Sequence, residues 1–405
     1  MMSRNATTTV LLFTRDLRIH DHPALAAAAE SSLLPLFVID EALMRRSANR
    51  AAFLLGALED LRASLAARGA PLVIRRGDPV RETVVLARQV GAQAIHLSGD
   101  VGPYARERER RLRRAAAAER IAVRSFPGVT VVPPEDLAPA GSDHYRVFTP
   151  YWRRWSLARL RPVAQAPARL RAPAGIDPGP LPALRELTSA APSPGLPAAG
   201  EGAALDRLAA WKAEGLDAYS RRRDALGEQG TSRLSPYLRF GCLSPRLLLA
   251  ELAPSPGAEA FARQLCWRDF FAQLLLARPR MRTEGLNERR SWLEDSAVLD
   301  MWREGSTGVA VVDAAMRQLR AEGWLPNRAR LIAAGYLTKT LGIDWRHGER
   351  HFFDLLVDGD PANNAGNWQW VAGVGTDPRR RGFNALRQAR RFDPTGSYVR
   401  RYADA

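Results

Sequence analysis

The densest concentration of reactive side chains in the sequence lies between residues 358 and 402. It opens with two carboxylates, Asp358 and Asp360, continues through amides and glycines, and reaches two tryptophans, Trp368 and Trp370. The amides interrupt any apolar stripe of a helix, and the glycines allow a ligand to approach the backbone closely. A flat ligand is the natural candidate, and an Asn- and Gly-rich loop between two helices is the ordinary alternative. The glycines concerned are Gly366, Gly373 and Gly375.

Arginines dominate the second half of this segment, where at least seven lie between Trp370 and Tyr402. Aromatic surfaces combined with positive charge are how single-stranded or flipped-out bases are held. The chain carries a net charge of +16, which also favours a polyanionic partner. A generally basic surface is the competing explanation, because the sequence is rich in arginine and has only two lysines, Lys212 and Lys339.

The order of residues in this segment resembles the flavin-binding region of the photolyase/cryptochrome family. The matching parts are Asp358-Gly-Asp-Pro-Ala-Asn-Asn-Ala-Gly-Asn-Trp-Gln-Trp, then Gly375-Thr-Asp and Phe392-Asp-Pro. The resemblance covers almost the whole chain except roughly residues 160 to 200, and it points to the class I photolyases, which act on cyclobutane pyrimidine dimers. It implies FAD as the cofactor and UV-damaged DNA as the partner.

A second segment carries the same resemblance. Gln229-Gly-Thr-Ser-Arg-Leu-Ser-Pro-Tyr-Leu places hydroxyls and backbone amides ahead of a helix start, where a diphosphate can bind, although an ordinary Ser/Thr helix cap is the alternative. In the family, Asp358 matches the partner of Arg330, Asp360 lies near the ribityl and isoalloxazine edge, and Asn364 faces flavin N5. The resemblance implies these FAD-binding residues: Tyr219, Thr231, Ser232, Arg233, Leu234, Ser235, Arg330, Asp358, Asp360 and Asn364.

Three tryptophans match the electron-relay triad of the family, in which Trp368 lies nearest the flavin and Trp292 nearest the surface. Indole can be oxidised by one electron and can pass the hole to a closely packed neighbour. A single buried tryptophan is more often core, but here three positions match at once. The implied catalytic set is Trp292, Trp345, Trp368, Asn364 and Gln264.

A further set matches the lesion pocket and its surroundings. Trp267 and Trp370 correspond to the aromatic wedge around a flipped dimer, Asn327 and Arg328 to its polar contacts, and Gln388 to a contact with the DNA backbone. The implied substrate and DNA-binding residues are Arg223, Gln264, Trp267, Asn327, Arg328, Trp370 and Gln388.

Some positions depart from the family pattern. Gln264 replaces the glutamate that usually hydrogen-bonds the dimer, and an amide still donates but supplies no proton. Glutamine here resembles the (6-4) and animal cryptochrome branch, yet no histidine lies in the pocket segment from Trp324 to Leu331. Leu331 and Ala385 replace an expected methionine and proline, and the chain ends at Ala405, short of the usual C-terminal segment.

The first third of the chain alternates short apolar runs with amphipathic ones, which predicts an α/β domain with a doubly wound parallel sheet. No G-x-G-x-x-G or P-loop follows the first strand, so the common dinucleotide and triphosphate sites are excluded. Predicted strands are 8–13, 33–39, 71–74, 94–98 and 121–126; predicted helices are 23–30, 50–68, 79–90 and 104–119.

The run from Thr14 to Leu25 resembles the N-terminal motif of the family's Rossmann-like antenna domain. Ligands of such sheets bind at the carboxyl ends of strands. A second antenna chromophore, a deazaflavin or folate, is therefore expected near four strand-end residues, for which helix capping and turn formation are the alternatives. These residues are Arg15, Asp16, Asp40 and Asp100.

Three regions follow from the pattern: an antenna domain over 1–132, a connector over 133–202 and an all-α FAD-binding domain over 203–405. Nine of the 28 prolines lie between 161 and 200, which is typical of a surface connector, and the aromatic stretch from Tyr145 to Trp155 is expected to pack against a domain. Helices are predicted at 205–214, 247–252, 258–277, 309–321, 329–341 and 350–356.

Cys242 and Cys266 have no paired spacing, so neither a disulfide framework nor a metal site is expected. No uncharged apolar stretch approaches a membrane span, and we expect a monomer in the bacterial cytoplasm, associated with the nucleoid through DNA.

Together these observations predict a photo-lyase in which excited, reduced FAD donates an electron to a flipped-out dimer. A cryptochrome-like photoreceptor, and a DNA-binding flavoprotein with weak or no repair, are the alternatives.

Overall fold

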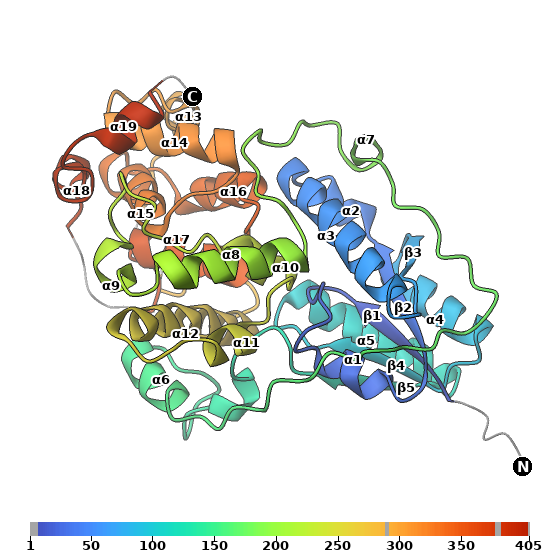
Figure 1. The fold of residues 1–405 in the computed structure, drawn as a ribbon. Helices are drawn as coiled ribbons and strands as arrows, with labels where there is room; N and C mark the ends of the chain where they lie inside the picture. Colours follow the sequence, from blue (N-terminus) through green and yellow to red (C-terminus); the bar gives the residue numbers. More distant parts are fainter. Residues whose placement is uncertain (1–6, 288–290, 377–381, 404–405) are drawn as a thin grey trace, which may run out of the picture.

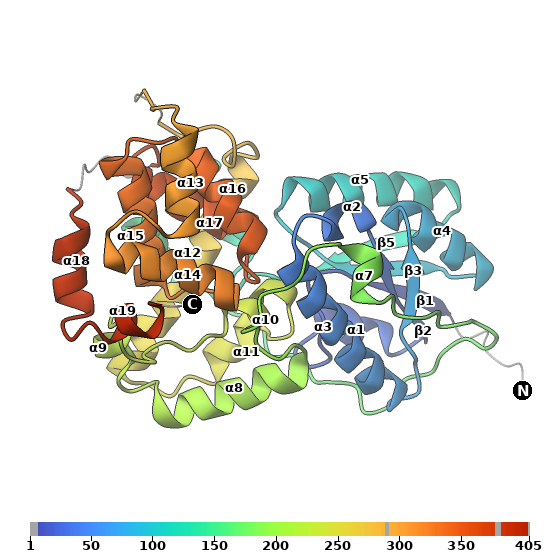
Figure 2. The same ribbon diagram turned by 90° about the horizontal axis from the view of Figure 1, so that it is seen from above.

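The computed structural model describes residues 7–287, 291–376 and 382–403. It contains an α/β domain, coloured blue to cyan in Figure 1, and a larger helical domain coloured green to red. The two lie side by side, and Figure 2 shows the same division from above. Three of the arginines noted above, at 379–381, fall outside the described residues.

The α/β domain is built on a parallel five-stranded sheet in the order β3-β2-β1-β4-β5. Alternate residues of β1 point to opposite faces: Leu11 and Phe13 join α1 and α3, whereas Val10 and Leu12 join α4 and α5. Helices therefore cover both faces, as the doubly wound prediction requires. The strands are Thr8–Phe13, Ser32–Ile39, Val73–Arg76, Ala94–Ser98 and Ala122–Phe126, and the helices are α1 Pro23–Ala28, α2 Glu41–Met44, α3 Ala48–Ala66, α4 Pro79–Gln89 and α5 Pro103–Ala118.

All five predicted strands are present. The largest difference is at β3, which begins at Val73 rather than at residue 71. The pairing of Leu36 with Val73 starts the contact between β2 and β3, and Pro71 has no N–H to contribute to a sheet. The short α2 was not predicted, because four residues are too few to show helical periodicity.

The connector contains three short helices: η1 Pro134–Leu137, α6 Phe148–Trp155 and α7 Leu184–Leu187. As predicted, its aromatic stretch packs against a domain, since Tyr151 and Phe148 of α6 contact Phe270 of α12. After α6 the chain, green in Figure 1, runs along the outside of the α/β domain past α7 and returns to α8.

The helical domain comprises α8 to α19. Its predicted helices are present, and the segment predicted as 329–341 is an α-helix followed by a π-helical turn. The elements are α8 Glu201–Glu214, α9 Tyr219–Arg222, α10 Ser235–Phe240, α11 Pro245–Ala250, α12 Pro256–Ala277, α13 Ser296–Glu304, α14 Ala310–Glu322, α15 Asn327–Gly335, η2 Tyr336–Thr340, α16 Trp345–Leu355, α17 Pro361–Ala372, α18 Ala385–Phe392 and α19 Ser397–Arg401.

The Asn- and Gly-rich segment is helical, which corrects the expectation that its amides would interrupt a helix. Asp360 caps the first turn of α17, Pro361 occupies its first position, and Gly373 ends it in the left-handed conformation at φ 77°. Gly366 is approached by the ring of Phe271 and not by a ligand, because an added Cβ would lie 2.1 Å from that ring. Helix packing therefore explains this glycine.

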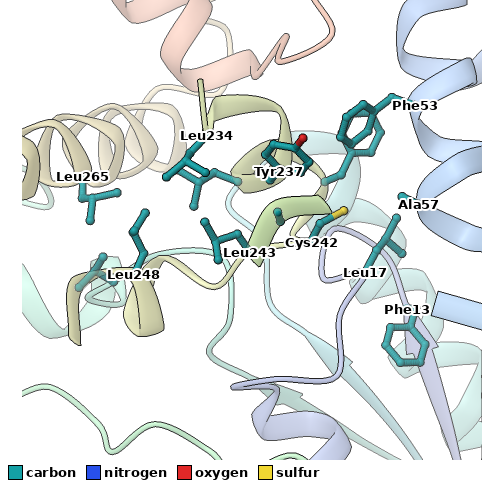
Figure 3. Close-up of a cluster of buried hydrophobic side chains, with 14 of the residues drawn as sticks. Phe13, Leu17, Phe53, Ala57, Leu234, Tyr237, Cys242, Leu243, Leu248 and Leu265 are labelled. Atoms are coloured by element: carbon teal, nitrogen blue, oxygen red, sulfur yellow. The ribbon is translucent and has the colours of Figure 1, made fainter. Parts of the chain in front are cut away.

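The two domains share one hydrophobic core. Figure 3 shows Phe13, Leu17 and Phe53 of the α/β domain in the same buried cluster as Tyr237 and Leu243 of the helical domain. The Phe53 ring lies 4.8 Å from that of Phe240. Because apolar burial is the main stabilising term, the domains are expected to fold as one body.

Candidate active site

A cavity of about 260 Å³ lies in the helical domain, lined by residues from α9 to α17. It brings together every residue that the sequence assigned to FAD, together with Gln264, Asn327 and Trp368. The FAD residues are Tyr219, Thr231, Ser232, Arg233, Leu234, Ser235, Arg330, Asp358, Asp360 and Asn364.

The predicted pair of Asp358 and Arg330 forms one wall. Arg330 Nη2 donates to Asp358 Oδ2 at 2.6 Å, and its Nε donates to the carbonyl of Leu325 at 2.9 Å. Asp358 Oδ1 is buried and has no hydrogen-bond partner among the residues that the structure describes. Because a buried acceptor without a donor is costly, this oxygen is suited to a ligand N–H or O–H.

Asp360 lies at the N-terminus of α17, and both of its carboxylate oxygens accept hydrogen bonds. Oδ1 accepts from the backbone N–H and the side chain of Asn363 at 2.9 and 2.8 Å, and Oδ2 accepts from Arg15 at 2.6 Å. Burial alone would raise the pKa of Asp360, but Arg15, then Arg239 and Arg268, hold that pKa well below its usual range. The carboxylate is therefore charged.

Asn364 is buried, and its orientation is fixed by Glu349 of α16. Asn364 Nδ2 donates to the carbonyl of Glu349 at 2.9 Å and to its Oε1 at 3.0 Å. Arg282 holds the same carboxylate through two further bonds of 2.8 and 3.0 Å. The amide oxygen of Asn364 is thus left to accept a hydrogen bond from a group in the cavity.

The segment Thr231 to Ser235 enters α10, but not as an ordinary side-chain cap. The N-cap position is Leu234, which makes no side-chain cap bond, and Arg233 has a left-handed φ of 55°. The Arg233 guanidinium lies 4.4 Å from the ring centre of Trp324, whose Nε1 donates to Ser235 Oγ at 3.0 Å. A left-handed non-glycine residue is strained and is held here by its surroundings.

The three predicted relay tryptophans share one cluster. Trp368 and Trp345 are buried, and the partly buried Trp292 packs against the same cluster. An isolated bridge between Leu293 and Ile343 joins the segments that carry Trp292 and Trp345. Trp368 also lines the cavity, so its expected place nearest the flavin fits the arrangement, although the relay itself stays a prediction.

The predicted aromatic wedge lines a second cavity of about 340 Å³ rather than the first. Trp267 and Trp370 both line it, and Phe148 of α6 stacks on Trp267 with ring centres 3.6 Å apart and planes 2° apart. Gln264, one turn before Trp267 on α12, lines the first cavity, where its Nε2 makes only a 3.5 Å contact with the carbonyl of Ala260. Phe148 thus occupies one face of the Trp267 indole.

Three predicted DNA contacts line neither of these two cavities. Arg328 Nη1 donates to Gln388 Oε1 at 3.3 Å, and Arg328 pairs with Asp224 at 3.1 Å. Arg223 is the C-cap of the short helix α9, next to Asp224 in the chain. The structure therefore brings Arg328 of α15 and Gln388 of α18 together outside the first cavity, near the end of α9.

Sequence reasoning missed two arginines of the cavity wall, Arg239 and Arg268. The pKa of Arg239 is lowered to about 9, first by burial and then by the nearby Arg15. Excess positive charge in this wall favours an anionic ligand, which a flavin diphosphate would supply. In a chain this rich in arginine no local signal marks these two, although Arg268 directly follows Trp267.

The four strand-end candidates for an antenna site are bound within the protein. Arg15 pairs with Asp100 at 3.1 Å, Asp16 pairs with His22 at 3.0 Å, and Asp40 caps α2. The alternative of capping is correct for Asp40. A chromophore site formed by these four side chains stays a prediction.

Comparison with known proteins adds to this geometry. Residues 9–170 match the DNA photolyase family and residues 261–405 match the FAD binding domain of DNA photolyase. The chain is 44% identical to a deoxyribodipyrimidine photo-lyase of Streptomyces griseus over 97% of this chain and 89% of the relative. The chain belongs to the DNA photolyase family.

Other relatives of this chain differ in name. A cryptochrome DASH of Gloeobacter violaceus is 35% identical over 98% of this chain and 86% of its own. A solved archaeal photolyase from Sulfolobus tokodaii, described with two FAD molecules and a novel light-harvesting cofactor, aligns with a TM-score of 0.86 at 28% identity, over 98% of this chain and 90% of that one. The chain is therefore an enzyme of a family whose members carry both photo-lyase and cryptochrome names.

The match to the FAD-binding domain confirms FAD as the cofactor of this protein. The cavity residues fit it, because they combine a carboxylate oxygen that has no partner in the described part of the chain, an amide oxygen that the Glu349 contacts do not use, and excess positive charge. None of the described helices is long and apolar enough to cross a membrane.

Proposed function

We propose that this protein uses light to repair cyclobutane pyrimidine dimers in DNA. One observation carries the proposal: residues assigned to flavin and residues assigned to the dimer, which come from distant parts of the chain, line one cavity. Gln264 and Asn327 share that cavity with Asn364 and Asp358. Electron transfer from a flavin to a base needs this proximity, and the streptomycete relative named deoxyribodipyrimidine photo-lyase supports the substrate class.

The side chains of the cavity have separate roles in this proposal. Bound FAD supplies the light-driven electron that opens the cyclobutane ring. Asn364 accepts from flavin N5–H through its oxygen, because Glu349 takes its two N–H bonds. Gln264, which is half-buried, and Asn327, which is exposed at the rim, donate to base carbonyls of the extruded dimer.

The surroundings bind the DNA. Trp267 offers the indole face that is not covered by Phe148 to an extruded base, and Trp370 lies beside it in the second cavity. Arg328, Gln388 and Arg223 contact the DNA backbone next to the lesion. For Arg328 this replaces the predicted contact with the dimer, because Arg328 lines neither cavity. Stacking holds the flipped base, whereas the arginine contacts act on any sequence.

The finer organisation is also part of this proposal. The antenna domain spans 1–132, the connector 133–202 and the FAD-binding domain 203–405. A second chromophore, deazaflavin or folate, gathers light for the flavin. The protein acts as a monomer on UV-damaged DNA in the cytoplasm, and it belongs to the class that repairs cyclobutane dimers.

Loss of dimers from a UV-irradiated oligonucleotide under blue light tests the function. The reduced protein is expected to remove cyclobutane dimers in the light and not in the dark, and to bind the irradiated strand more tightly than an untreated one. The cryptochrome DASH relative gives the alternative, a photoreceptor. Light-driven flavin chemistry without repair and without preference for damaged DNA would establish that alternative instead.

A further inference from the structure

Arg15 links the α/β domain to two segments of the flavin cavity. It follows β1, and its Nη2 donates to Asp360 Oδ2 at 2.6 Å, across 345 positions of sequence. Its Nε donates to the backbone carbonyl of Arg239 on α10 at 3.3 Å. Arg239 and Asp360 both line the cavity, so the Arg15 guanidinium, which belongs to the α/β domain, contacts two separate segments of the cavity lining.

The guanidinium is itself held in place. Asp100, which follows β4, accepts from Arg15 Nη1 through both oxygens at 3.1 and 3.3 Å. The side chain of Asp100 is 5% exposed and that of Arg15 is 17% exposed. Because the carboxyl ends of β1 and β4 are neighbours in the sheet, the α/β domain presents Arg15 in one fixed orientation.

The surrounding backbone contact is close. An added Cβ at Gly241, which has a φ of 70°, would lie 2.0 Å from the carbonyl oxygen of Arg15. The Leu17 N–H donates to the carbonyl of Phe240 at 3.2 Å, and Arg18 donates to that of Gly241 at 2.9 Å. The loop after β1 is thereby docked on the end of α10.

Asp360 divides its two oxygens between the domains. Oδ2 binds Arg15, whereas Oδ1 caps the first turn of α17 through Asn363. Asn363, Asn364 and Trp368 follow on this helix, and all three line the cavity. A shift of the Asp360 carboxylate would therefore move the N-terminus of the helix that presents these side chains.

We infer that Arg15 is a positioning residue for the flavin: through its ion pair with Asp360 it fixes the start of α17 against the cofactor. The inference rests on the proposed function only in placing flavin in this cavity. If Arg15 acts in this way, the packing of the α/β domain against the helical domain affects both how long FAD stays bound and how fast it is photoreduced. Arg15 does not line the cavity, so its effect on the flavin passes through Asp360 and α10.

The test uses the full-length protein loaded with FAD and measures the rate of FAD release from the rise in flavin fluorescence after dilution. Arg15→Gln should accelerate release on the order of tenfold, a coupling typical of directly contacting charged residues. Asp360→Asn keeps an oxygen for the helix cap but loses the ion pair. The double variant should release FAD no faster than the faster single variant, because both changes remove the same pair.

Two further variants separate positioning from general stability. Arg15→Lys retains the charge and should restore part of the retention. His20→Ala removes another contact between the domains, the pair of His20 with Glu201, at residues that do not line the cavity, and should release FAD at the wild-type rate. Photoreduction of the flavin-bound fraction, with dithiothreitol as reductant, should be slowed by Arg15→Gln and unchanged by His20→Ala.

Each outcome decides the inference. Wild-type retention in Arg15→Gln, additive effects in the double variant, or equal losses in Arg15→Gln and His20→Ala would each overturn it. If Arg15→Gln does not fold, Asp360→Asn and Arg15→Lys give the same comparison. A wild type that binds FAD but repairs no dimers defeats the proposed function and leaves this inference standing.

Discussion

The amide of Asn364 is bound to Glu349 by its nitrogen alone. Nδ2 lies 2.9 Å from the backbone carbonyl of Glu349 and 3.0 Å from its Oε1, so both N–H bonds point away from the cavity. The hydrogen bonds of Nδ2 therefore indicate that the amide oxygen faces the cavity. In the proposed function this oxygen faces flavin N5, where an acceptor favours a flavin that carries a proton on N5, which is the reduced form.

Asn364→Ala should destabilise reduced relative to oxidised flavin, because that form loses its acceptor. A neutral hydrogen bond contributes about 1 kcal/mol, so the equilibrium should shift roughly fivefold toward the oxidised form. Redox titration followed by visible absorption measures the shift. Asn287→Ala is the matched control, because it removes an exposed amide side chain that does not line the cavity. An unchanged potential in Asn364→Ala would refute this orientation of the amide.

Trp368→Phe should slow or abolish photoreduction of oxidised flavin and leave repair by chemically reduced protein largely intact. Repair uses the path from flavin to dimer, which does not pass through Trp368. An added Cβ at Gly348 would lie 2.2 Å from the Trp368 ring, and Gly348 is one turn after Trp345 on α16. Transient absorption of the single variants of Trp292, Trp345 and Trp368 measures the relay.

Trp302 supplies a stringent comparison for that experiment. It is buried, its ring centre lies 6.1 Å from that of Trp368, and its Nε1 donates to the carbonyl of Ala333. Photoreduction should survive in Trp302→Phe if the predicted triad carries the hole. Loss of photoreduction in Trp302→Phe, with normal rates in Trp292→Phe and Trp345→Phe, would show that the hole passes through Trp302 and not through the predicted triad.

Local chemistry made much of this site predictable from sequence. The two domain types and the five strands follow from periodicity, whereas the predicted residues of the flavin cavity follow from motifs that resemble the photolyase/cryptochrome family. The helical state of α17 did not follow, because asparagines are weak helix formers in isolation. Here they face a cavity and are bound by Asp360 and Glu349, so tertiary contacts override propensity.

Contacts between distant segments were the unpredictable part. Nothing near Trp267 in sequence indicates that Phe148 covers one of its faces, and nothing near Asp360 indicates Arg15. The expectation that Arg15 lies at an antenna site rests on the rule that ligands bind at strand ends, and that site stays a prediction. The helical domain also reaches the end of β1, where the Arg15 guanidinium binds the carboxylate of Asp360.

His351 should make the fold less stable as the solution becomes acidic. Burial first, then Arg303 and Arg320, lower the pKa of His351 to about 4, against about 6.5 for an unfolded chain. Between these values the unfolded chain binds the proton and the folded one does not. Stability is therefore complete above about pH 6.5 and falls toward pH 4, by at most about 1.4 kcal/mol per unit.

Thermal unfolding between pH 7.5 and 4.5, at about half-unit steps, checks this window. His351→Phe should flatten the pH dependence relative to wild type, whatever it does to absolute stability. His347→Phe, on the same helix with a side chain 37% exposed, controls for removal of a histidine. Parallel curves for wild type and His351→Phe would contradict the assignment.

Gln264 should make repair present but inefficient. Its amide contributes about 1 kcal/mol through a neutral hydrogen bond to a base carbonyl, whereas a glutamate sharing a proton could contribute roughly 1.5 to 3. Gln264→Glu should therefore raise the quantum yield of cyclobutane-dimer repair, and Gln264→Ala should lower both binding and repair. Glu259→Gln, an exposed change on the same helix, should alter neither.

Trp267→Ala should weaken binding to the dimer more than to undamaged DNA, because stacking of about 1 to 3 kcal/mol exists only for the extruded base. If Gln264→Glu and Gln264→Ala both repair at the wild-type rate, Gln264 does not contact the dimer, and the lesion lies instead against Trp267 and Trp370 in the second cavity.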